Sequence, residues 1–375
     1  MARLIKVHIL FLGNPFHDSR IVNLSNSLKA DGCEVRVTAF DWMDKNFVTV
    51  KGGISVFKLV KRKFSLPYYL RFYSILFAET KKYKADILFA EDVHCLPVAA
   101  FFSKIRKSKL FYNSRELYAY LGGLRNKKFV QSIVKFVEKS FIRKCDLVLT
   151  TGEMDSEFLE KFYGIKNTVV IRNIPLLQQP TKIINFRELL PIEADKTILL
   201  YQGVMLDGRG IELIFRALSS IKNSVLVLLG DGPKKQFFEM KAKELNLTDR
   251  VFFMGSIPQN ELINYTAGAE VGFALIENIS VSYYYALPNK LFEYIMAGLP
   301  IVSSNLPQMK KIIEKYDLGI VIDLEKSEDI SAEINDFIND KARLEKYRLN
   351  CVAASQELNW QNEYNRAKSK LLNIN

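Results

Sequence analysis

Residues 283–302 read YYYALPNKLFEYIMAGLPIV, and the rest of the chain is organised around this stretch. Pro288 stands at the expected start of a short helix, Gly298 and Pro300 end that helix, and a strand begins at Ile301. Proline at a helix start and glycine just past its end is the usual asymmetry of helix termini. The stretch therefore predicts a loop, a short helix and a strand, which is typical of an α/β fold.

Two side chains of this predicted helix suggest a ligand. The N-terminus of a helix offers free amides to a phosphate, and Lys290 stands in the first turn. Glu293 follows one turn further on, where a carboxylate can accept from both hydroxyls of a ribose. The pattern favours a nucleotide site. The same residues also fit an ordinary surface helix with a solvated Glu293.

The stretch resembles the donor-binding segment of glycosyltransferase family 4, and the resemblance recurs from residue 7 to about residue 365. It implies an α/β GT-B fold, with two facing Rossmann-like domains and the active site in the cleft between them. It also implies a retaining, nucleotide-sugar-dependent enzyme that needs no metal or other cofactor, in which Glu293 holds the ribose. The family usually has a second glutamate eight residues earlier, where this chain has Tyr285, so we expect donor-sugar recognition to differ.

Composition sets the broad class. The chain has 375 residues, of which 49% are hydrophobic and 25% charged, as in a soluble enzyme of two domains. No apolar run approaches the roughly 18–20 residues of a membrane-spanning helix. Four scattered cysteines suggest neither disulfides nor zinc, and we expect a cytoplasmic protein.

The net charge of +12 is uneven along the chain. Residues 1–175 hold 30 Lys and Arg against 16 Asp and Glu, whereas the remainder holds 23 against 25. Such asymmetry indicates a polyanionic partner, either a nucleic acid or an anionic membrane surface. Residues 58–84 combine lysines with the aromatic run YYLRFYSILF, which fits a helix lying in a membrane interface or one packed on its own domain. No nucleic-acid-binding motif is recognisable, so the membrane is the favoured partner and the protein is expected to be peripheral.

Buried apolar runs alternate with helical patterns through both halves of the chain. The expected strands cover residues 7–12, 35–38, 86–90, 110–112, 146–150 and 169–173, then 198–201, 225–229, 251–255, 271–275, 301–303 and 319–323. We expect an acceptor-binding domain at 1–176 and a nucleotide-sugar-binding domain at 195–354. The helix at 355–375 is similar to one that packs back on the first domain in GT-B proteins.

Strand ends supply the remaining candidates, because ligands of α/β sheets bind outside the carboxyl ends of the strands. In the first domain the cleft candidates are Gly13, Arg20 and His94, and the candidate catalytic carboxylates are Asp18, Asp92 and Glu116. Asp18 and Arg20 fit a helix cap and a surface charge equally well. Family members often carry histidines near Asp92 and Glu116 that are replaced here, so no histidine role is transferred.

In the second domain, Arg209 stands in a glycine loop where the family usually has a lysine, and either side chain can grip a pyrophosphate. The predicted donor-binding residues are Gly203, Arg209, Ile257, Tyr285, Asn289, Lys290, Leu291 and Glu293.

The leading interpretation is a glycosyltransferase that moves a sugar from a nucleotide-sugar donor to a saccharide or lipid-linked saccharide acceptor, in bacterial surface polysaccharide biosynthesis. A sugar-nucleotide 2-epimerase shares the GT-B architecture and remains an alternative. A non-catalytic protein that binds a glycan or a sugar nucleotide is a third, because Tyr285 replaces the family glutamate.

Overall fold

The computed structural model describes residues 4–41, 49–60, 65–326 and 330–373. The chain divides into two compact units, which we describe separately. Unit 1 comprises Met1–Arg172 with Glu363–Asn375, and unit 2 comprises Asn173–Asn362. Residues 177–194, which lie between the two domains expected from the sequence, fall within unit 2.

Unit 1 is built on an eight-stranded sheet in the order β3-β4-β2-β1-β5-β6-β7-β8. All neighbouring strands are parallel except β3 and β4, which form a hairpin. The strands are β1 (Lys6–Phe11), β2 (Glu34–Asp41), β3 (Thr49–Lys51), β4 (Ile54–Lys58), β5 (Ile87–Ala90), β6 (Lys109–Ser114), β7 (Leu147–Thr150) and β8 (Thr168–Val170). The hairpin was not predicted, although its Gly52-Gly53 turn, with both glycines at positive φ, is a recognised hairpin signal.

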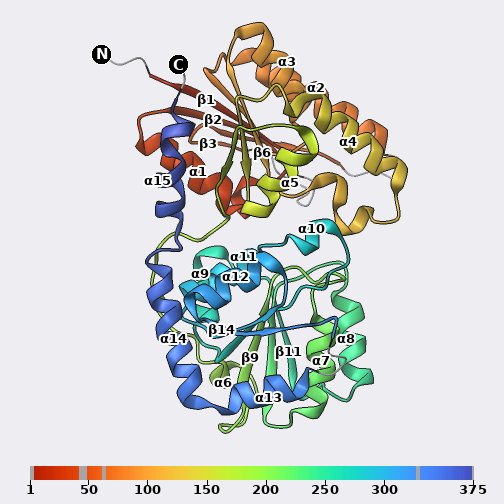
Figure 1. Ribbon diagram of the computed structural model, residues 1–375, viewed down its shortest axis with the longest axis vertical. Helices are drawn as coiled ribbons and strands as arrows, with labels where there is room; N and C mark the ends of the chain where they lie inside the picture. The colour runs from red at the N-terminus through yellow and green to blue at the C-terminus, as the bar shows by residue number, and fades with distance from the viewer. Residues whose placement is uncertain (1–3, 42–48, 61–64, 327–329, 374–375) are drawn as a thin grey trace. The chain divides into compact units, whose positions relative to one another are not determined.

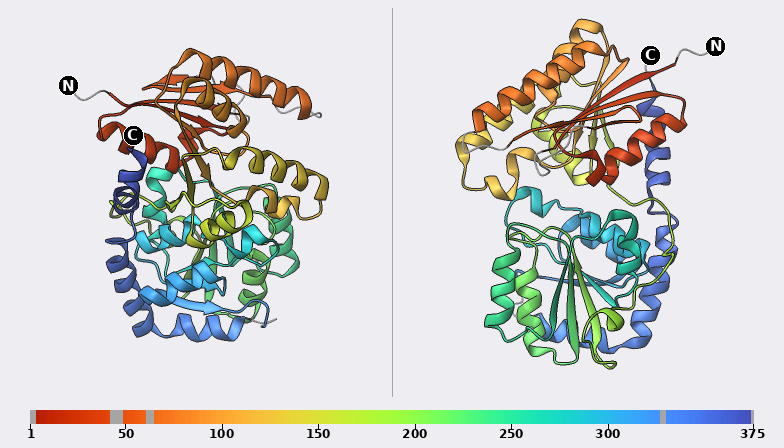
Figure 2. Two further views of the ribbon diagram at one scale, coloured as in Figure 1. Left: turned by 45° about the horizontal axis from the view of Figure 1, so that its top comes forward. Right: turned by 180° about the vertical axis from the view of Figure 1, so that it is seen from behind.

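Helices cover both faces of this sheet (Figure 1). They are α1 (Ser19–Ala30), α2 (Ser65–Lys82), α3 (Leu96–Arg106), α4 (Lys128–Ile142), α5 (Glu153–Tyr163) and α15 (Trp360–Leu371), with short 3-10 helices η1 (Pro15–His17), η2 (Tyr118–Tyr120) and η3 (Gly122–Leu124). α15 lies beside α1, where Tyr364 Oη donates to Asp31 at 2.6 Å and Lys368 pairs with the same carboxylate at 2.5 Å. α2 and α4 lie on the opposite side of the unit from α1 and α15, as both views of Figure 2 show.

The aromatic face of α2 packs mainly against its own domain. Phe72 and Leu76 are fully buried, and the ring centroid of Phe72 lies 4.8 Å from that of Phe40. These two residues therefore agree with the alternative in which α2 packs on its own domain. Lys61, Arg62 and Lys63, the basic residues expected just before α2, lie outside the described residues.

Unit 2 contains a fully parallel six-stranded sheet in the order β11-β10-β9-β12-β13-β14. The strands are β9 (Thr197–Gln202), β10 (Ser224–Leu229), β11 (Val251–Gly255), β12 (Val271–Ala274), β13 (Ile301–Ser304) and β14 (Gly319–Ile322). The helices are α6 (Phe186–Leu189), α7 (Ile211–Ser220), α8 (Lys235–Glu244), α9 (Gln259–Thr266), α10 (Val281–Tyr284), α11 (Asn289–Met296), α12 (Pro307–Tyr316), α13 (Ser331–Asn339) and α14 (Lys341–Ser355). Every residue of the central strands β9, β10, β12 and β13 is buried, as expected for a parallel sheet covered on both faces.

Strand order reverses once in each sheet. In unit 2 the chain moves outward from β9 in one direction and from β12 in the other, and in unit 1 the reversal falls between β1 and β5. Loops leaving the carboxyl ends of such strand pairs diverge, and ligands of doubly wound folds bind in the crevice between them. We therefore expect ligand-binding residues near these two reversals of strand order.

No helix among residues 4–41, 49–60, 65–326 and 330–373 is both long enough and apolar enough to cross a membrane. All four cysteines are buried free thiols.

His8 makes the stability of unit 1 sensitive to acid. The imidazole is fully buried in β1, with Nε2 2.8 Å from Thr38 Oγ1, and burial lowers its pKa from 6.5 to about 3, assisted by the charges of Arg36 and Arg106. Below pH 6.5 the unfolded chain binds a proton that the folded chain does not, so stability falls as pH decreases towards 3, by about 1.4 kcal/mol per pH unit.

We expect His8→Gln, which can still hydrogen-bond to Thr38, to show a shallower loss of stability between neutral and acidic pH. Urea unfolding at several pH values measures the slope, and His94→Gln is the matched control. Equal slopes for His8→Gln and the wild type would contradict this assignment.

Candidate functional site

The start of α11 lies ready to receive an anion. Pro288 occupies the N-cap in an extended conformation (φ −74°, ψ 145°), and no side chain caps the helix. The first amides of α11 are therefore not satisfied by a capping side chain. At the other end, Gly298 adopts φ 68°, as the predicted helix stop requires.

Lys290, in the first turn of α11, carries a buried ammonium group. Its Nζ lies 3.6 Å from the ring centroid of Tyr201 and has no hydrogen-bond partner among the described residues. Gly203 follows β9 beside it, with φ 128°, and a Cβ at Gly203 would lie 3.5 Å from Lys290 Cε. Burial lowers the pKa of Lys290 well below its usual value, and the nearby charge of Arg209 lowers it further. The charge of Glu293 opposes this fall, but no described residue accepts a hydrogen bond from the ammonium group.

Arg209 supplies the second cation. It stands in the loop before α7, and its guanidinium carbon lies 4.9 Å from the ring centroid of Tyr283. Its Nε is buried without a hydrogen-bond partner in the part of the chain that the structure describes. Gly210, at φ 71°, caps α7 directly after it. Two neighbouring cations, of which one is fully enclosed, form an environment that favours a phosphate or pyrophosphate.

Glu293 lies one turn further along α11 and is held by two amides. Its Oε2 accepts from Gln202 Nε2 at 2.5 Å, and its Oε1 accepts a long contact of 3.4 Å from Gln259. Burial raises the pKa of Glu293, while these two hydrogen bonds and the charge of Lys290 oppose the rise. A small pocket adjoins the carboxylate, lined by Pro175, Gln178, Gln259, Leu262, Ile263, Thr266, Glu293 and Met296.

Gln202 is a site residue that we did not predict. It is the last residue of β9, Thr266 Oγ1 donates to its Oε1 at 2.8 Å, and its backbone amide donates to Tyr294 Oη at 3.1 Å. These contacts turn its amide nitrogen towards Glu293. Its position at the carboxyl end of β9, directly before Gly203, is the sequence signal that points to it.

The other predicted donor residues contribute less through their side chains. Leu291 is fully buried in the core, so that only its backbone can face a ligand. Asn289 is exposed at the first turn of α11, and Ile257 packs half-buried on the core. Tyr285 is half-buried, and its carbonyl accepts from Gln308 at 2.6 Å. Of the predicted set, the structure brings together Gly203, Arg209, Lys290 and Glu293.

In unit 1, charged residues meet at the corresponding reversal of strand order. Asp18 caps α1 by accepting from the amide of Ile21 at 3.1 Å and pairs with Arg115 at 2.5 Å. Arg20 is buried and donates to Asn113 Oδ1 at 2.8 Å, and Asn113 donates to Glu91 Oε2 at 2.7 Å. Glu91, Asn113 and Arg115 were not among our candidates, although Glu91 and Asn113 directly follow predicted strands and Arg115 lies two residues after Asn113.

Burial perturbs the charges of this cluster. It raises the pKa of Glu91, against the opposing charges of Arg115 and Arg20, and it lowers the pKa of Arg20 to about 10, together with the charge of Arg115. Glu91 Oε1 and Arg20 Nη1 are both buried without a hydrogen-bond partner among the described residues. One acceptor and one donor of this cluster are therefore left unused within the described residues.

The remaining unit 1 candidates have different surroundings. Asp92 accepts from the backbone amides of Leu12 at 2.7 Å and Cys95 at 2.9 Å, so both its oxygens hold main chain in place. Glu116 is exposed, and the ring of His94 lies 5.7 Å from that of Tyr69. Gly13 is buried against the Phe11 ring, where a Cβ would clash at 2.3 Å. A catalytic role for Asp18, Asp92 or Glu116 stays a prediction.

No group of three or more His, Cys, Asp or Glu side chains that could hold a metal occurs among the described residues.

Two family models cover most of the chain. Residues 182–357 match the model described as Glycosyl transferases group 1, and residues 19–174 match the model described as Glycosyltransferase Family 4. The chain belongs to glycosyltransferase family 4.

Known relatives of this family 4 protein are distant. One relative is the lipopolysaccharide core biosynthesis glycosyltransferase LpsD of Rhizobium meliloti, to which this chain is 27% identical over 157 residues. The matched segment covers 42% of this chain and 43% of LpsD. The matched segments span between 40% and 62% of the curated relatives' length.

Solved structures agree on the fold. Sucrose-phosphate synthase of Thermosynechococcus elongatus superposes with a TM-score of 0.79 at 19% identity, covering 98% of each chain. HepE of Anabaena, solved in complex with UDP, gives a TM-score of 0.69 at 18% identity, covering 98% of this chain and 99% of HepE. At these identities the likeness establishes the GT-B fold of two Rossmann-like domains, as predicted, and nothing more.

We expect the buried ammonium group of Lys290 to lower the stability of this family 4 protein while it strengthens the binding of an anion. We expect Lys290→Met to raise the free energy of unfolding without ligand by about 1 kcal/mol, because it removes an unpaired buried charge. The folded pKa of Lys290 lies below its unfolded value, so wild-type stability rises relative to the variant as pH increases from that lowered pKa towards about 10.4.

Urea unfolding of both proteins across this alkaline range measures the difference, with the exposed Lys311→Met as control. A loss of stability in Lys290→Met at neutral pH would show that the ammonium group has a structural partner.

Proposed function

We propose that this protein is a retaining glycosyltransferase that transfers a sugar from a nucleoside diphosphate sugar to a saccharide acceptor. The observation that carries the proposal is the pair of cations at the end of β9: Lys290 Nζ, buried without a partner among the described residues, and Arg209 beside it. A protein retains an enclosed, unpaired charge when a ligand of opposite charge offsets its cost. The diphosphate of a sugar nucleotide supplies that charge.

The residues then divide the work. Lys290, Arg209 and the free amides of α11 hold the diphosphate, and they stabilise the negative charge that develops on it as the bond to the sugar C1 breaks. The acceptor hydroxyl oxygen forms the new bond to C1, and its proton leaves to the departing phosphate or to a base. When the donor binds, the ribose hydroxyls replace Gln202 and Gln259 as hydrogen-bond donors to Glu293. This division requires no metal.

A uridine nucleotide is the first donor to test. HepE of Anabaena has been solved with UDP and with UDP-glucose, and this protein shares its fold. The pocket beside Glu293 provides amides from Gln178 and Gln259, which suit the hydrogen-bonding edge of a base. We therefore propose a UDP-sugar donor.

We assign the binding of the acceptor to unit 1. Arg20 Nη1 and Glu91 Oε1 are a buried donor and a buried acceptor without partners among the described residues, at the carboxyl ends of the strands. A saccharide hydroxyl can satisfy both kinds of group at once. We propose that unit 1 binds a saccharide or lipid-linked saccharide, and that the reaction belongs to bacterial surface polysaccharide assembly, in keeping with the lipopolysaccharide role named for LpsD.

A thermal-shift panel of UDP-, GDP-, CDP- and ADP-sugars tests the donor site. A ligand at about 100 times its Kd stabilises a protein by roughly 2.7 kcal/mol, which is readily measured. We expect one nucleotide family to shift the wild type and the exposed control Lys311→Met, and both Lys290→Met and Glu293→Gln to lose that shift.

Product analysis with the stabilising nucleotide tests the reaction. We expect sugar transfer to a saccharide acceptor, reduced by about 10²–10³ in kcat for Arg209→Met. Conversion of the nucleotide sugar to its epimer without an acceptor would instead identify an epimerase. Tight binding with no turnover on any acceptor tried would favour the glycan-binding alternative. A panel in which no nucleotide stabilises the wild type would refute the donor site itself.

A further inference from the structure

α4 carries its apolar stripe on the outside. Phe129, Ile133 and Phe136 follow the i, i+4, i+7 spacing of one helix face, and 78%, 47% and 72% of each residue is exposed. Of the fifteen residues of α4, all described, the two that are buried are Glu138 and Ile142. An ordinary surface helix buries its apolar stripe and exposes its charges, so this arrangement is the reverse of the usual one.

Polar contacts anchor the inner side of α4. Glu138 accepts from Tyr112 Oη and from Tyr163 Oη, each at 2.7 Å, and Lys135 Nζ lies 4.4 Å from the ring centroid of Tyr120. The helix is therefore fixed to unit 1 without using Phe129 or Phe136. Their exposure is a stable feature of the surface, and such patches mark interaction sites.

The surroundings of the stripe are strongly basic. Residues 96–144 contain twelve Lys and Arg but two acidic residues, Glu116 and the buried Glu138. Exposed basic residues flank the stripe at Arg125, Lys127, Lys128, Lys139, Arg143 and Lys144. We call Phe129, Val130, Ile133 and Phe136, together with these flanking basic residues, the α4 patch.

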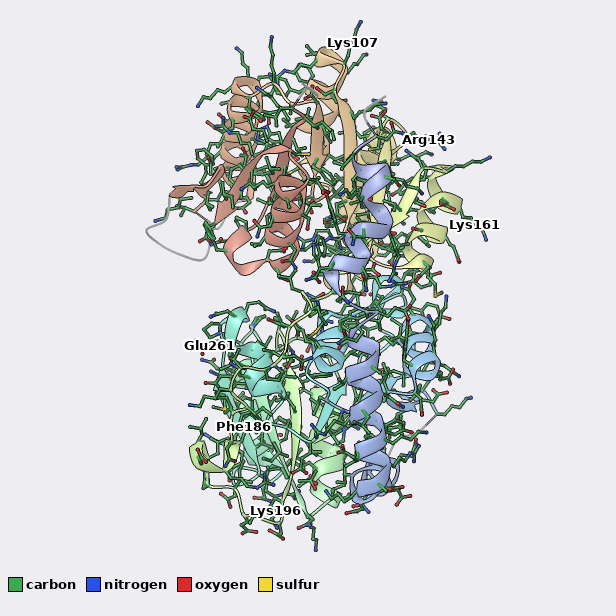
Figure 3. All side chains as sticks on the ribbon, turned by 90° about the vertical axis from the view of Figure 1, so that its left-hand side faces the viewer. Lys107, Arg143, Lys161, Phe186, Lys196 and Glu261 are labelled. Atoms are coloured by element: carbon green, nitrogen blue, oxygen red, sulfur yellow. The ribbon has the colours of Figure 1, made fainter. Side chains whose placement is uncertain are left out.

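The neighbouring helix continues the same chemistry. α3 packs against both α2 and α4, and it exposes Phe101 and Ile105 as well as Lys104 and Lys107. In Figure 3 the side chain of Lys107, at the end of α3, extends outward from unit 1. Aromatic and branched apolar groups ringed by lysines therefore occur on two adjacent helices.

We propose that the α4 patch docks this protein on an anionic lipid bilayer, with α4 lying in the interface plane. Phe129, Ile133 and Phe136 would enter the boundary between headgroups and acyl chains, and the flanking basic residues would contact anionic headgroups. An apolar stripe bordered by basic residues matches an anionic bilayer, which offers an apolar interior beneath anionic headgroups. Our sequence analysis left residues 58–84 open between a membrane interface and packing on their own domain, and the burial of Phe72 and Leu76 in α2 favours packing.

Vesicle flotation of the full chain tests the proposal. We compare phosphatidylcholine vesicles with and without phosphatidylglycerol, for the wild type, the double variant Phe129→Ser/Phe136→Ser, and the matched control Met240→Ser/Leu349→Ser, which changes two exposed apolar residues of unit 2. The wild type and the control should bind the anionic vesicles, and the double variant should bind at least about ten-fold more weakly.

Charge variants test the electrostatic part. Lys128→Gln/Lys139→Gln should weaken binding by about five-fold per lysine at low salt, and raised salt should weaken wild-type binding. All variants should unfold at the wild-type temperature, because the changed side chains are exposed. Flotation of Phe129→Ser/Phe136→Ser equal to the wild type, or equal binding of the wild type to neutral and anionic vesicles, would overturn the proposal.

A fluorescent reporter tests insertion directly. Phe136→Trp should show blue-shifted emission with anionic vesicles and quenching by brominated acyl chains, whereas Met240→Trp should show neither. An unchanged Phe136→Trp spectrum would contradict insertion. Sedimentation that shows a wild-type dimer lost in Phe129→Ser/Phe136→Ser would identify a second copy as the occupant and refute the membrane. None of these readouts depends on the donor site.

Discussion

The donor site that we propose in unit 2 depends on the buried ammonium group of Lys290. This group lies over the Tyr201 ring, beside the backbone of Gly203, and the nearby Arg209 repels it rather than neutralising it. Enclosing such a charge costs free energy, and burial accordingly drives the pKa of Lys290 down. Gly203, the start of α11 without a capping side chain and the loop that carries Arg209 lie around this ammonium group, as the diphosphate site that we propose requires.

The two units differ in how their charged residues are paired. Each places charged residues where strand order reverses, but in unit 1 the charges largely satisfy one another, through Asp18 with Arg115 and through Arg20, Asn113 and Glu91. What remains there is one donor, Arg20 Nη1, and one acceptor, Glu91 Oε1, each without a partner among the described residues. In unit 2, Lys290 Nζ and Arg209 Nε have no hydrogen-bond partner in the part of the chain that the structure describes, which suits a diphosphate. A charged donor and a neutral sugar acceptor fit this difference.

Sequence predicted the fold well because buried parallel strands read as continuous apolar runs, and because Pro288 and Gly298 delimit α11 by backbone conformation alone. It placed Lys290 and Glu293 on this helix for the same local reason. It could not predict that Gln202 meets Glu293, since that contact joins β9 to α11 across 91 positions of sequence. Nor could periodicity decide which apolar helix is buried: α2 and α4 look alike in sequence, yet α2 buries Phe72 whereas α4 exposes Phe136.

The most direct test of the central claim is the number of protons bound when the protein takes up UDP-glucose. Titration calorimetry at mildly alkaline pH, in two buffers of different ionisation enthalpy, measures it. An ammonium group whose pKa is depressed by burial regains its proton beside a diphosphate, so we predict uptake of up to one proton per site in the wild type, and none in Lys290→Arg, whose guanidinium stays charged. Binding without proton uptake by the wild type throughout the alkaline range would contradict the account.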